Sequence, residues 1–209
     1  MVGFLKIREN IWYEAIISAM ADEKPYFTPL GFRVVNNVVK LRVYSSAKTS
    51  SLLAMNSEVV LNITDDPFLY FLSTFKEETG GIPKEEVGFI EGLPVLLKAY
   101  GYVIMRKKKV SQQERVVLFE YDIEKIIDNP SFYTSIEPYS RCRTFLIEMI
   151  IYASKIRDVS ILPGTGDLLN SFKKSFDYSY EIVAKTCMGQ AEIWLANRLK
   201  EMVSDWLRK

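Results

Sequence analysis

The first two-thirds of the chain is a series of apolar segments with the two-residue alternation that is typical of β-strands. Val38–Tyr44 (VVKLRVY) alternates most regularly, and Asn36-Asn37 separates it from Tyr26–Val35. Adjacent asparagines favour a tight hairpin turn, because Asn tolerates positive φ. We expect further strands at Ile11–Ala21, Glu58–Thr64, Lys98–Arg106 and Arg115–Ile123. Six or so strands in meander order predict a small antiparallel β-barrel.

The last third of the chain has the three-to-four-residue apolar spacing of helices. Arg141–Arg157 is apolar around its middle, which predicts a mostly buried helix that ends at Pro163-Gly164. Asp167–Phe176 predicts a short helix, and Tyr180–Leu207 a long amphipathic one. The predicted fold class is α+β, mainly β. We expect two domains, an antiparallel barrel at 1–135 and a C-terminal helical region at 136–209 packed on the barrel.

Two polar segments are expected at the surface of the barrel domain. Lys76–Pro94 contains glycines and prolines and predicts a loop or lid. Lys107–Gln113 is expected at the tip of the last hairpin. The basic run Arg106–Lys109 beside it is more often a solvated turn than a nucleic-acid contact.

The chain contains no histidine. Histidine-dependent nucleophilic triads, histidine general acid–base catalysis and nearly all catalytic zinc sites are therefore excluded, and we expect no metal site. If the protein performs chemistry, we expect a cofactor to carry it. The 27 basic and 26 acidic residues give a net charge of +1, so overall charge provides no reason to expect a nucleic-acid or acidic-membrane partner.

The two cysteines, Cys142 and Cys187, are far apart and form no CxxC motif. We expect them to be reduced and buried, although a disulfide between them stays open. The first ten residues lack the apolar core of a signal peptide, and no apolar run is long enough to span a membrane. A soluble, cytoplasmic protein is expected.

The segment Val43–Leu53 (VYSSAKTSSLL) joins a predicted strand to a predicted helix. Ser46 or Thr49 could cap that helix. The same hydroxyls, the free N–H groups of a helix start and Lys48 could instead bind a phosphate. The local sequence favours the cap.

Two further motifs flank this segment. Pro29-Leu30-Gly31 interrupts a strand, which marks either a kink or a place where a ligand approaches the backbone. Asp66-Pro67 fits a helix N-cap followed by the first helical residue, and this reading is favoured over a divalent-ion site.

In their order along the chain, Pro29-Leu30-Gly31-Phe32-Arg33, the Ser45-Ser46-Ala47-Lys48-Thr49 turn and Asn62-Ile63-Thr64-Asp65-Asp66-Pro67 resemble the FMN-binding split-barrel superfamily. This superfamily includes flavin reductases and pyridoxamine-phosphate oxidases. More narrowly, the chain resembles an uncharacterised, largely archaeal family of unknown function with a C-terminal helical part. The resemblance covers about residues 10 to 160 and implies a split barrel.

The resemblance also implies a cofactor site. The turn after the central strand would hold the FMN phosphate, the strand before it would follow the ribityl chain and ring, and the earlier strand would offer its backbone to the ring edge. The implied cofactor-binding residues are Pro29, Leu30, Gly31, Arg33, Val43, Tyr44, Ser45, Ser46, Lys48, Thr49, Asn62 and Arg141. Arg33 is the candidate cation for the anionic edge of reduced flavin.

The expected function is that of an FMN-binding flavoprotein that transfers hydride or electrons, with catalytic residues and substrate unknown. Whether it is an enzyme stays open, because a split-barrel module could also hold FMN or another phosphorylated ligand without turnover. A third reading is an interaction protein built on the C-terminal helices. The resemblance implies a homodimer with the flavin near the interface.

Overall fold

The computed structural model describes residues 7–10, 12–130 and 140–208, and it divides into two compact units. The barrel unit consists of Met1–Thr64 and Gly80–Ile136, and the helical unit of Asp65–Thr79 and Glu137–Lys209. The domain boundary predicted at residues 135/136 lies outside the described residues. The helical unit also includes Asp65–Thr79, which the sequence assigned to the barrel domain.

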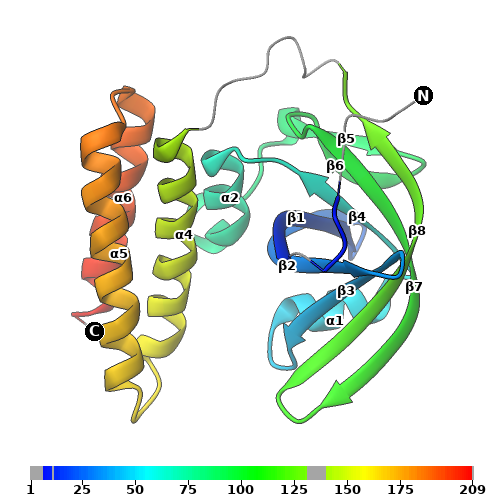
Figure 1. The fold of residues 1–209 in the computed structure, drawn as a ribbon, viewed down its shortest axis with the longest axis horizontal. Coiled ribbons are helices and arrows are strands. Elements are labelled where there is room, and N and C mark those ends of the chain that lie inside the picture. The colour runs from blue at the N-terminus through cyan, green and yellow to red at the C-terminus, as the bar shows by residue number, and fades with distance from the viewer. Residues whose placement is uncertain (1–6, 11, 131–139, 209) are drawn as a thin grey trace. The chain divides into compact units, whose positions relative to one another are not determined.

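The barrel unit is a closed antiparallel barrel in the order β1-β2-β3-β8-β7-β4 (Figure 1). Its strands are β1 (Trp12–Ala21), β2 (Lys24–Val35), β3 (Val38–Tyr44), β4 (Glu58–Ile63), β7 (Gly101–Gln113) and β8 (Val116–Asp128). The barrel and the hairpin turn at Asn36-Asn37, where both residues have positive φ, are confirmed. Ile11, the predicted first residue of β1, lies outside the described residues.

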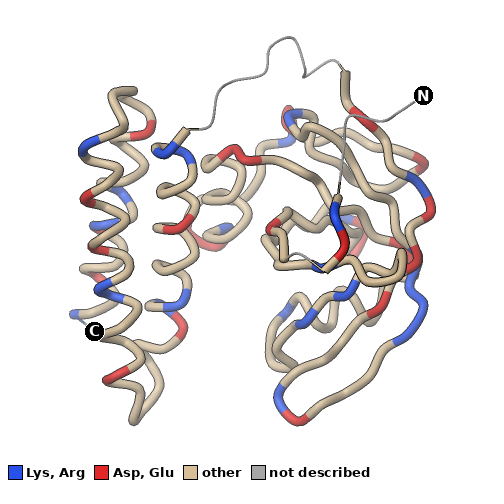
Figure 2. The backbone as a smooth tube through the Cα atoms, in the orientation of Figure 1, with Lys and Arg blue, Asp and Glu red and all other residues tan. Residues whose placement is uncertain are grey.

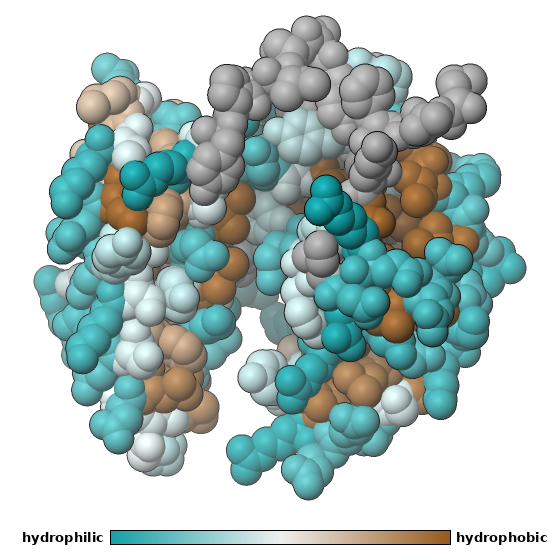
Figure 3. All heavy atoms as spheres, in the orientation of Figure 1, coloured by the Kyte–Doolittle hydropathy of each residue, from teal (hydrophilic) through white to brown (hydrophobic). Residues whose placement is uncertain are grey.

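The two-residue alternation sorts each strand into an inner and an outer face. On β3, Val39, Leu41 and Val43 lie in the barrel core, whereas Arg42 and Tyr44 are exposed. Figure 3 shows the visible outer surface of the barrel unit as largely hydrophilic. Leu52 and Leu53 of helix α1 (Lys48–Met55) join the same core, and each contributes about 2 kcal/mol by its burial.

Only three residue pairs, Ile16↔Asn62 to Ser18↔Val60, join β1 to β4 and close the barrel. The fully buried Asn62 side chain reinforces this short ladder. Its Nδ2 donates to the Ile16 carbonyl at 2.9 Å and to Ser18 Oγ at 2.8 Å, and its Oδ1 accepts from the Leu96 N–H at 2.7 Å. Its amide thus links three segments of the barrel unit, with both N–H groups and one lone pair of Oδ1 engaged in these contacts. The cofactor contact of Asn62 stays a prediction.

The segment predicted as a loop or lid at residues 76–94 has more structure than expected. It contains α3 (Lys76–Thr79), the 3₁₀ turn η1 (Lys84–Glu86) and the hairpin of β5 (Val87–Ile90) and β6 (Leu93–Leu96). Pro94, Val95 and Leu96 are buried, and Ser18 Oγ donates to the Pro94 carbonyl at 2.6 Å. Strand β6 thus packs on the outer face of the barrel, which the polar composition of the segment did not reveal.

The last hairpin is longer than predicted. Lys107–Gln113 belongs to β7, and the turn lies at Glu114 and Arg115, with Glu114 at φ 36°. Figure 2 shows the basic run of β7 as one continuous stretch of positive charge. Two of its residues are ion-paired rather than only solvated, since Arg106 contacts Glu58 and Glu124, and Lys108 contacts Asp122.

The helical unit consists of α2 (Pro67–Thr74), α3, α4 (Arg141–Ser160), α5 (Gly166–Thr186) and α6 (Gln190–Trp206). Asp66 caps α2 by accepting the Phe68 N–H at 2.8 Å, as predicted. The helix predicted at Asp167–Phe176 continues to Thr186. The long helix predicted at Tyr180–Leu207 is wrong, because Cys187–Gly189 interrupts it.

The structure overturns the expectation of reduced cysteines. Cys142 and Cys187 form a disulfide, with their Cα atoms 5.1 Å apart. It joins the first turn of α4 to the end of α5, so the two cysteines are neighbours only after the helices have paired. No helix in the described part of the chain is long and apolar enough to cross a membrane.

Replacing Asn62 by leucine should lower the free energy of unfolding by about 3 kcal/mol, because the buried Leu96 N–H and Ile16 carbonyl lose their partner. Urea denaturation followed by circular dichroism measures the change. Gln113→Leu, an exposed amide at the end of β7, is the control and should alter stability by no more than about 0.5 kcal/mol. A loss as small as that of the control would show that the Asn62 contacts do not support the barrel.

Candidate functional site

Strands β2 and β3 part from one another halfway along their length. Among the described residues they pair only from Phe32↔Leu41 to Val35↔Val38. Residues 24–31 of β2 stay paired with β1, and residues 42–44 of β3 stay paired with β8. We call this place the β2–β3 divergence. The backbone of Pro29-Leu30-Gly31 and that of Val43-Tyr44 therefore flank a part of the barrel where the two strands do not satisfy each other's hydrogen bonds.

The side chains at the β2–β3 divergence differ in direction. Val43 is buried in the barrel core and Leu30 packs against that core, so both residues can offer only their backbone to a ligand. Tyr44 points outward and is 70% exposed. Pro29 and Gly31 are half-buried on the outer face of β2.

The turn after β3 has a defined backbone. The Ser45 N–H and Oγ both donate to the Arg115 carbonyl, at 2.9 and 3.2 Å, and the Ala47 N–H donates to the Tyr44 carbonyl at 3.0 Å. Ser45 thus ties the turn to the tip of the β7–β8 hairpin. This role leaves Ser46, Lys48 and Thr49 as the side chains grouped around the start of α1.

Helix α1 begins without a side-chain cap. Its N-cap residue is Ala47, and within the described ranges no side chain accepts a cap hydrogen bond there. The expectation that Ser46 or Thr49 caps the helix is therefore wrong. An uncapped helix start keeps N–H donors and a positive partial charge, which together favour an anion.

The other end of α1 is firmly held. Lys107 Nζ donates to the Leu53 and Ala54 carbonyls at 3.0 and 2.6 Å, and Asn56 Nδ2 donates to the Leu52 carbonyl at 2.9 Å. Partial burial lowers the pKa of Lys107. Near this lysine, burial also raises the pKa of the Tyr121 hydroxyl, so that group stays neutral at physiological pH. These contacts fix α1, and with it the position of its uncapped end.

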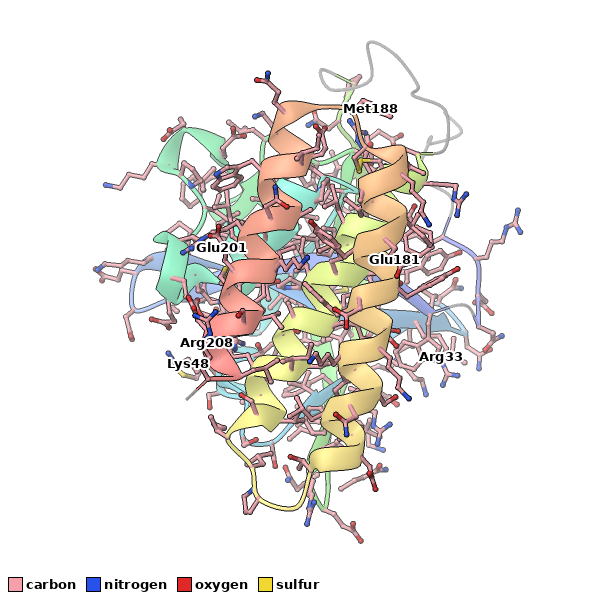
Figure 4. All side chains as sticks on the ribbon, turned by 90° about the vertical axis from the view of Figure 1, so that its left-hand side faces the viewer. Arg33, Lys48, Glu181, Met188, Glu201 and Arg208 are labelled. Atoms are coloured by element: carbon pink, nitrogen blue, oxygen red, sulfur yellow. A yellow bond between two sulfur atoms is a disulfide. The ribbon has the colours of Figure 1, made fainter. Side chains whose placement is uncertain are left out.

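Arg33 lies beside the last β2–β3 pair, opposite Lys40. Its guanidinium carbon is 5.2 Å from the centre of the Trp12 ring, and its buried Nε has no hydrogen-bond acceptor among the described residues. Figure 4 shows Arg33 and Lys48 on opposite sides of the barrel unit. Lys40, opposite Arg33, and Tyr44, at the end of β3, are four residue steps or about 13 Å apart along the strand.

Two neighbours of these residues on β1 were not predicted from the sequence. Trp12 faces Arg33 and is 55% exposed, and Glu14 faces Gly31. A Cβ atom at Gly31 would lie 3.2 Å from Glu14 Oε1, so the glycine leaves room for this carboxylate over β2. Alternation on β1 placed Trp12 and Glu14 on one face, but their register against β2 was not readable from the sequence.

Arg141 belongs to the helical unit, whereas the residues described above belong to the barrel unit. It is the exposed first residue of α4, and its guanidinium carbon lies 5.9 Å from the centre of the Phe145 ring. Its cofactor contact stays a prediction. The described residues contain no cluster of three or more Cys, Asp or Glu side chains that could hold a metal ion.

Comparisons with known proteins agree with this architecture. The model of the N-terminal domain of the DUF447 family of proteins of unknown function matches residues 13–129. The FMN-bound protein MM1853 from Methanosarcina mazei, assigned to the same family model, superposes with a TM-score of 0.77 at 18% identity, over 94% of this chain and 96% of its own. The flavin reductase HpaC, solved with NADP+, superposes with a TM-score of 0.50 at 14% identity, over 64% of this chain and 85% of its own. These similarities show a shared fold. No curated protein matches the sequence significantly.

Ala47→Asp should raise the free energy of unfolding of the unliganded protein by about 1 kcal/mol, because the new carboxylate supplies the side-chain cap that the start of α1 lacks among the described residues. Thermal unfolding in phosphate-free buffer measures the effect. The same change at the other end of the helix, Ala54→Asp, is the control and should destabilise the protein, because it places negative charge at the negative end of the helix. Destabilisation by both changes would argue against an open helix start.

Proposed function

We propose that this chain, which belongs to the DUF447 family, binds FMN in its barrel unit and transfers hydride or electrons through the bound flavin. The observation that carries the proposal is the uncapped start of α1, which lies directly after β3 at the β2–β3 divergence. The presence of FMN in a protein of the same family and fold supports it. The unpartnered Arg33 Nε further suggests that the site accommodates an acceptor.

The start of α1 would hold the phosphate end of FMN. The hydroxyls of Ser46 and Thr49 and the ammonium of Lys48 supply neutral and charged donors to a dianion. Backbone N–H groups of the first turn add further donors. Ser45, fixed to the Arg115 carbonyl, would keep the turn in the conformation that these donors require.

The ring end of the cofactor would lie along β3 toward Arg33. FMN is elongated, and the run of β3 from Tyr44 back to Lys40 provides a surface of about the right length. Flavin supplies reversible hydride and electron acceptance. Arg33 would stabilise the negative charge of the reduced ring, and Trp12 and the backbone of Pro29-Leu30-Gly31 would orient the ring and exclude water.

The proposal includes a homodimer with the flavin near the interface and a cytoplasmic, archaeal setting. A disulfide is compatible with this setting, because intracellular proteins of hyperthermophilic archaea are rich in disulfides. Light scattering on the FMN-loaded protein should give twice the chain mass of 24.1 kDa. A monomer at all FMN loadings would remove the dimer from the proposal.

Titration with FMN should quench flavin fluorescence at micromolar concentrations, and Lys48→Ala should weaken FMN binding about 10- to 100-fold, because one charge-assisted hydrogen bond is lost. Riboflavin, which lacks the phosphate, should bind wild type and Lys48→Ala alike. Lys109→Ala, an exposed lysine on β7, is the matched control and should leave FMN affinity unchanged.

Two outcomes would contradict the proposed site. Absence of any flavin binding by the wild-type protein would refute the proposed function. Equal loss of FMN and riboflavin affinity in Lys48→Ala would show that the phosphate does not bind at the start of α1.

Anaerobic addition of NADH, NADPH or a reduced deazaflavin to the FMN-loaded protein should bleach the visible flavin absorbance. Arg33→Met should slow reduction while leaving the phosphate-dependent part of FMN affinity intact, because Arg33 lies far from Lys48. If FMN binds and no donor reduces it, the chain is the non-catalytic flavin module that the sequence left open.

A further inference from the structure

The disulfide of the helical unit joins opposite poles of two helices. Cys142 is the second residue of α4, which is 20 residues long, and Cys187 is the C-cap residue of α5, which is 21 residues long. A helix carries positive partial charge at its N-terminus and negative partial charge at its C-terminus. Figure 4 shows the disulfide close to Met188, at the turn between α5 and α6. The two sulfur atoms therefore occupy different electrostatic surroundings.

The neighbours of Cys142 strengthen this difference. Arg141 and Arg143 flank it, and within the described residues the first turn of α4 contains no acidic side chain. Arg143 Nη1 lies 3.8 Å from Asp65 Oδ1. Asp65 therefore reduces, but does not cancel, the positive potential that Arg143 adds at the start of α4. A thiol at a helix start between cations ionises more readily than an ordinary cysteine.

The neighbours of Cys187 have the opposite effect. Cys187 is only 3% exposed, whereas Cys142 is half-buried. The Cys187 N–H donates to the Val183 carbonyl at 2.8 Å, which keeps the residue at the negative end of α5. The nearest cation on α5, Lys185, is paired with Glu181 at 4.0 Å. Burial and the helix end both disfavour a thiolate at this position.

We propose that Cys142 and Cys187 are a redox-active pair that exchanges with small thiols and disulfides, with Cys142 as the sulfur that forms the mixed disulfide. A small thiolate attacks Cys142 Sγ, which is the more exposed sulfur and lies at the positive end of α4; the protein S–S bond breaks, and Cys187 leaves and takes up a proton. A second small thiolate attacks the small-molecule sulfur of the mixed disulfide and releases Cys142 as a thiolate. In sum, one protein disulfide and two small thiols become one protein dithiol and one small disulfide.

A purely structural cross-link is the alternative. The bridge closes a loop with a sequence separation of 45, which would stabilise the fold by restricting the unfolded chain. A structural cross-link needs no difference between the two sulfurs, whereas redox exchange through Cys142 requires such a difference. Redox exchange at this pair does not depend on FMN binding, so it and the proposed flavin function can be refuted separately.

The first test uses the native wild-type protein in glutathione buffers of defined ratio, followed by acid quenching and mass spectrometry. The disulfide should open without denaturant, and glutathione should be found on Cys142 in at least about tenfold excess over Cys187. Opening only after denaturation, or equal labelling of both sulfurs, would overturn the proposal and leave a structural cross-link.

The second test measures the alkylation rate by iodoacetamide against pH in two single-cysteine variants. Cys142 in Cys187→Ser should titrate clearly below the ordinary thiol pKa of about 8.5, and Cys187 in Cys142→Ser should titrate above it. Arg141→Gln, introduced into Cys187→Ser, should slow alkylation of Cys142 at neutral pH, whereas Arg157→Gln in the last turn of α4 is the control and should not. An ordinary or raised pKa at Cys142 would contradict the proposal. If either variant fails to fold, the wild-type labelling decides alone.

Discussion

Closure of the barrel by β1 is the constraint on which the rest of the barrel unit depends. β1 pairs with β2 along ten residues but with β4 along only three, and the buried Asn62 amide supports that short ladder. Closure gives β1 a partner strand on each side, whereas β2 and β3 keep unpaired backbone at the β2–β3 divergence. The same amide holds Leu96, and thereby β6, against the outside of the ring. The Asn62 side chain thus supports both the pairing of β1 with β4 and the packing of β6 on the outer face of the barrel.

The candidate site follows from this closure. Because β1 pairs with β2 from Lys24 to Arg33, residues 24–31 of β2 stay in the sheet although they have no partner on β3. Because Lys107 and Tyr121 surround the end of α1, the start of the helix is placed where β3 ends. The polar groups at the β2–β3 divergence are therefore positioned by contacts made elsewhere in the barrel. This arrangement suits a site that must hold an elongated ligand by its two ends.

Local patterns along the chain predicted much of this unit. The alternation of Val38–Tyr44, the Asn36-Asn37 turn and the Asp66 cap of α2 depend on neighbouring residues only, and all three are present in the structure. Predictions failed where the structure of a residue depends on contacts with residues far away in the sequence. Lys107 was assigned to a turn because its partners, the carbonyls of α1, are 53 and 54 residues away. Ser46 and Thr49 were natural cap candidates, but the geometry of the turn made Ala47 the cap residue.

The sequence by itself determined that six strands alternate, that helices follow, and that serine, threonine and lysine side chains gather between β3 and α1. The absence of histidine also indicated that hydride or electron transfer would depend on a cofactor, whereas the thiol–disulfide exchange proposed for Cys142 and Cys187 needs none. Only the tertiary structure decided that the Asn62 side chain hydrogen-bonds to β1 and β6, that the Trp12 ring packs against Arg33, and that Cys142 and Cys187 form a disulfide. The physical reason is the same in each case. Register between strands and pairing between helices bring together residues far apart in the chain, and side chains take their roles from those neighbours rather than from the residues beside them in sequence.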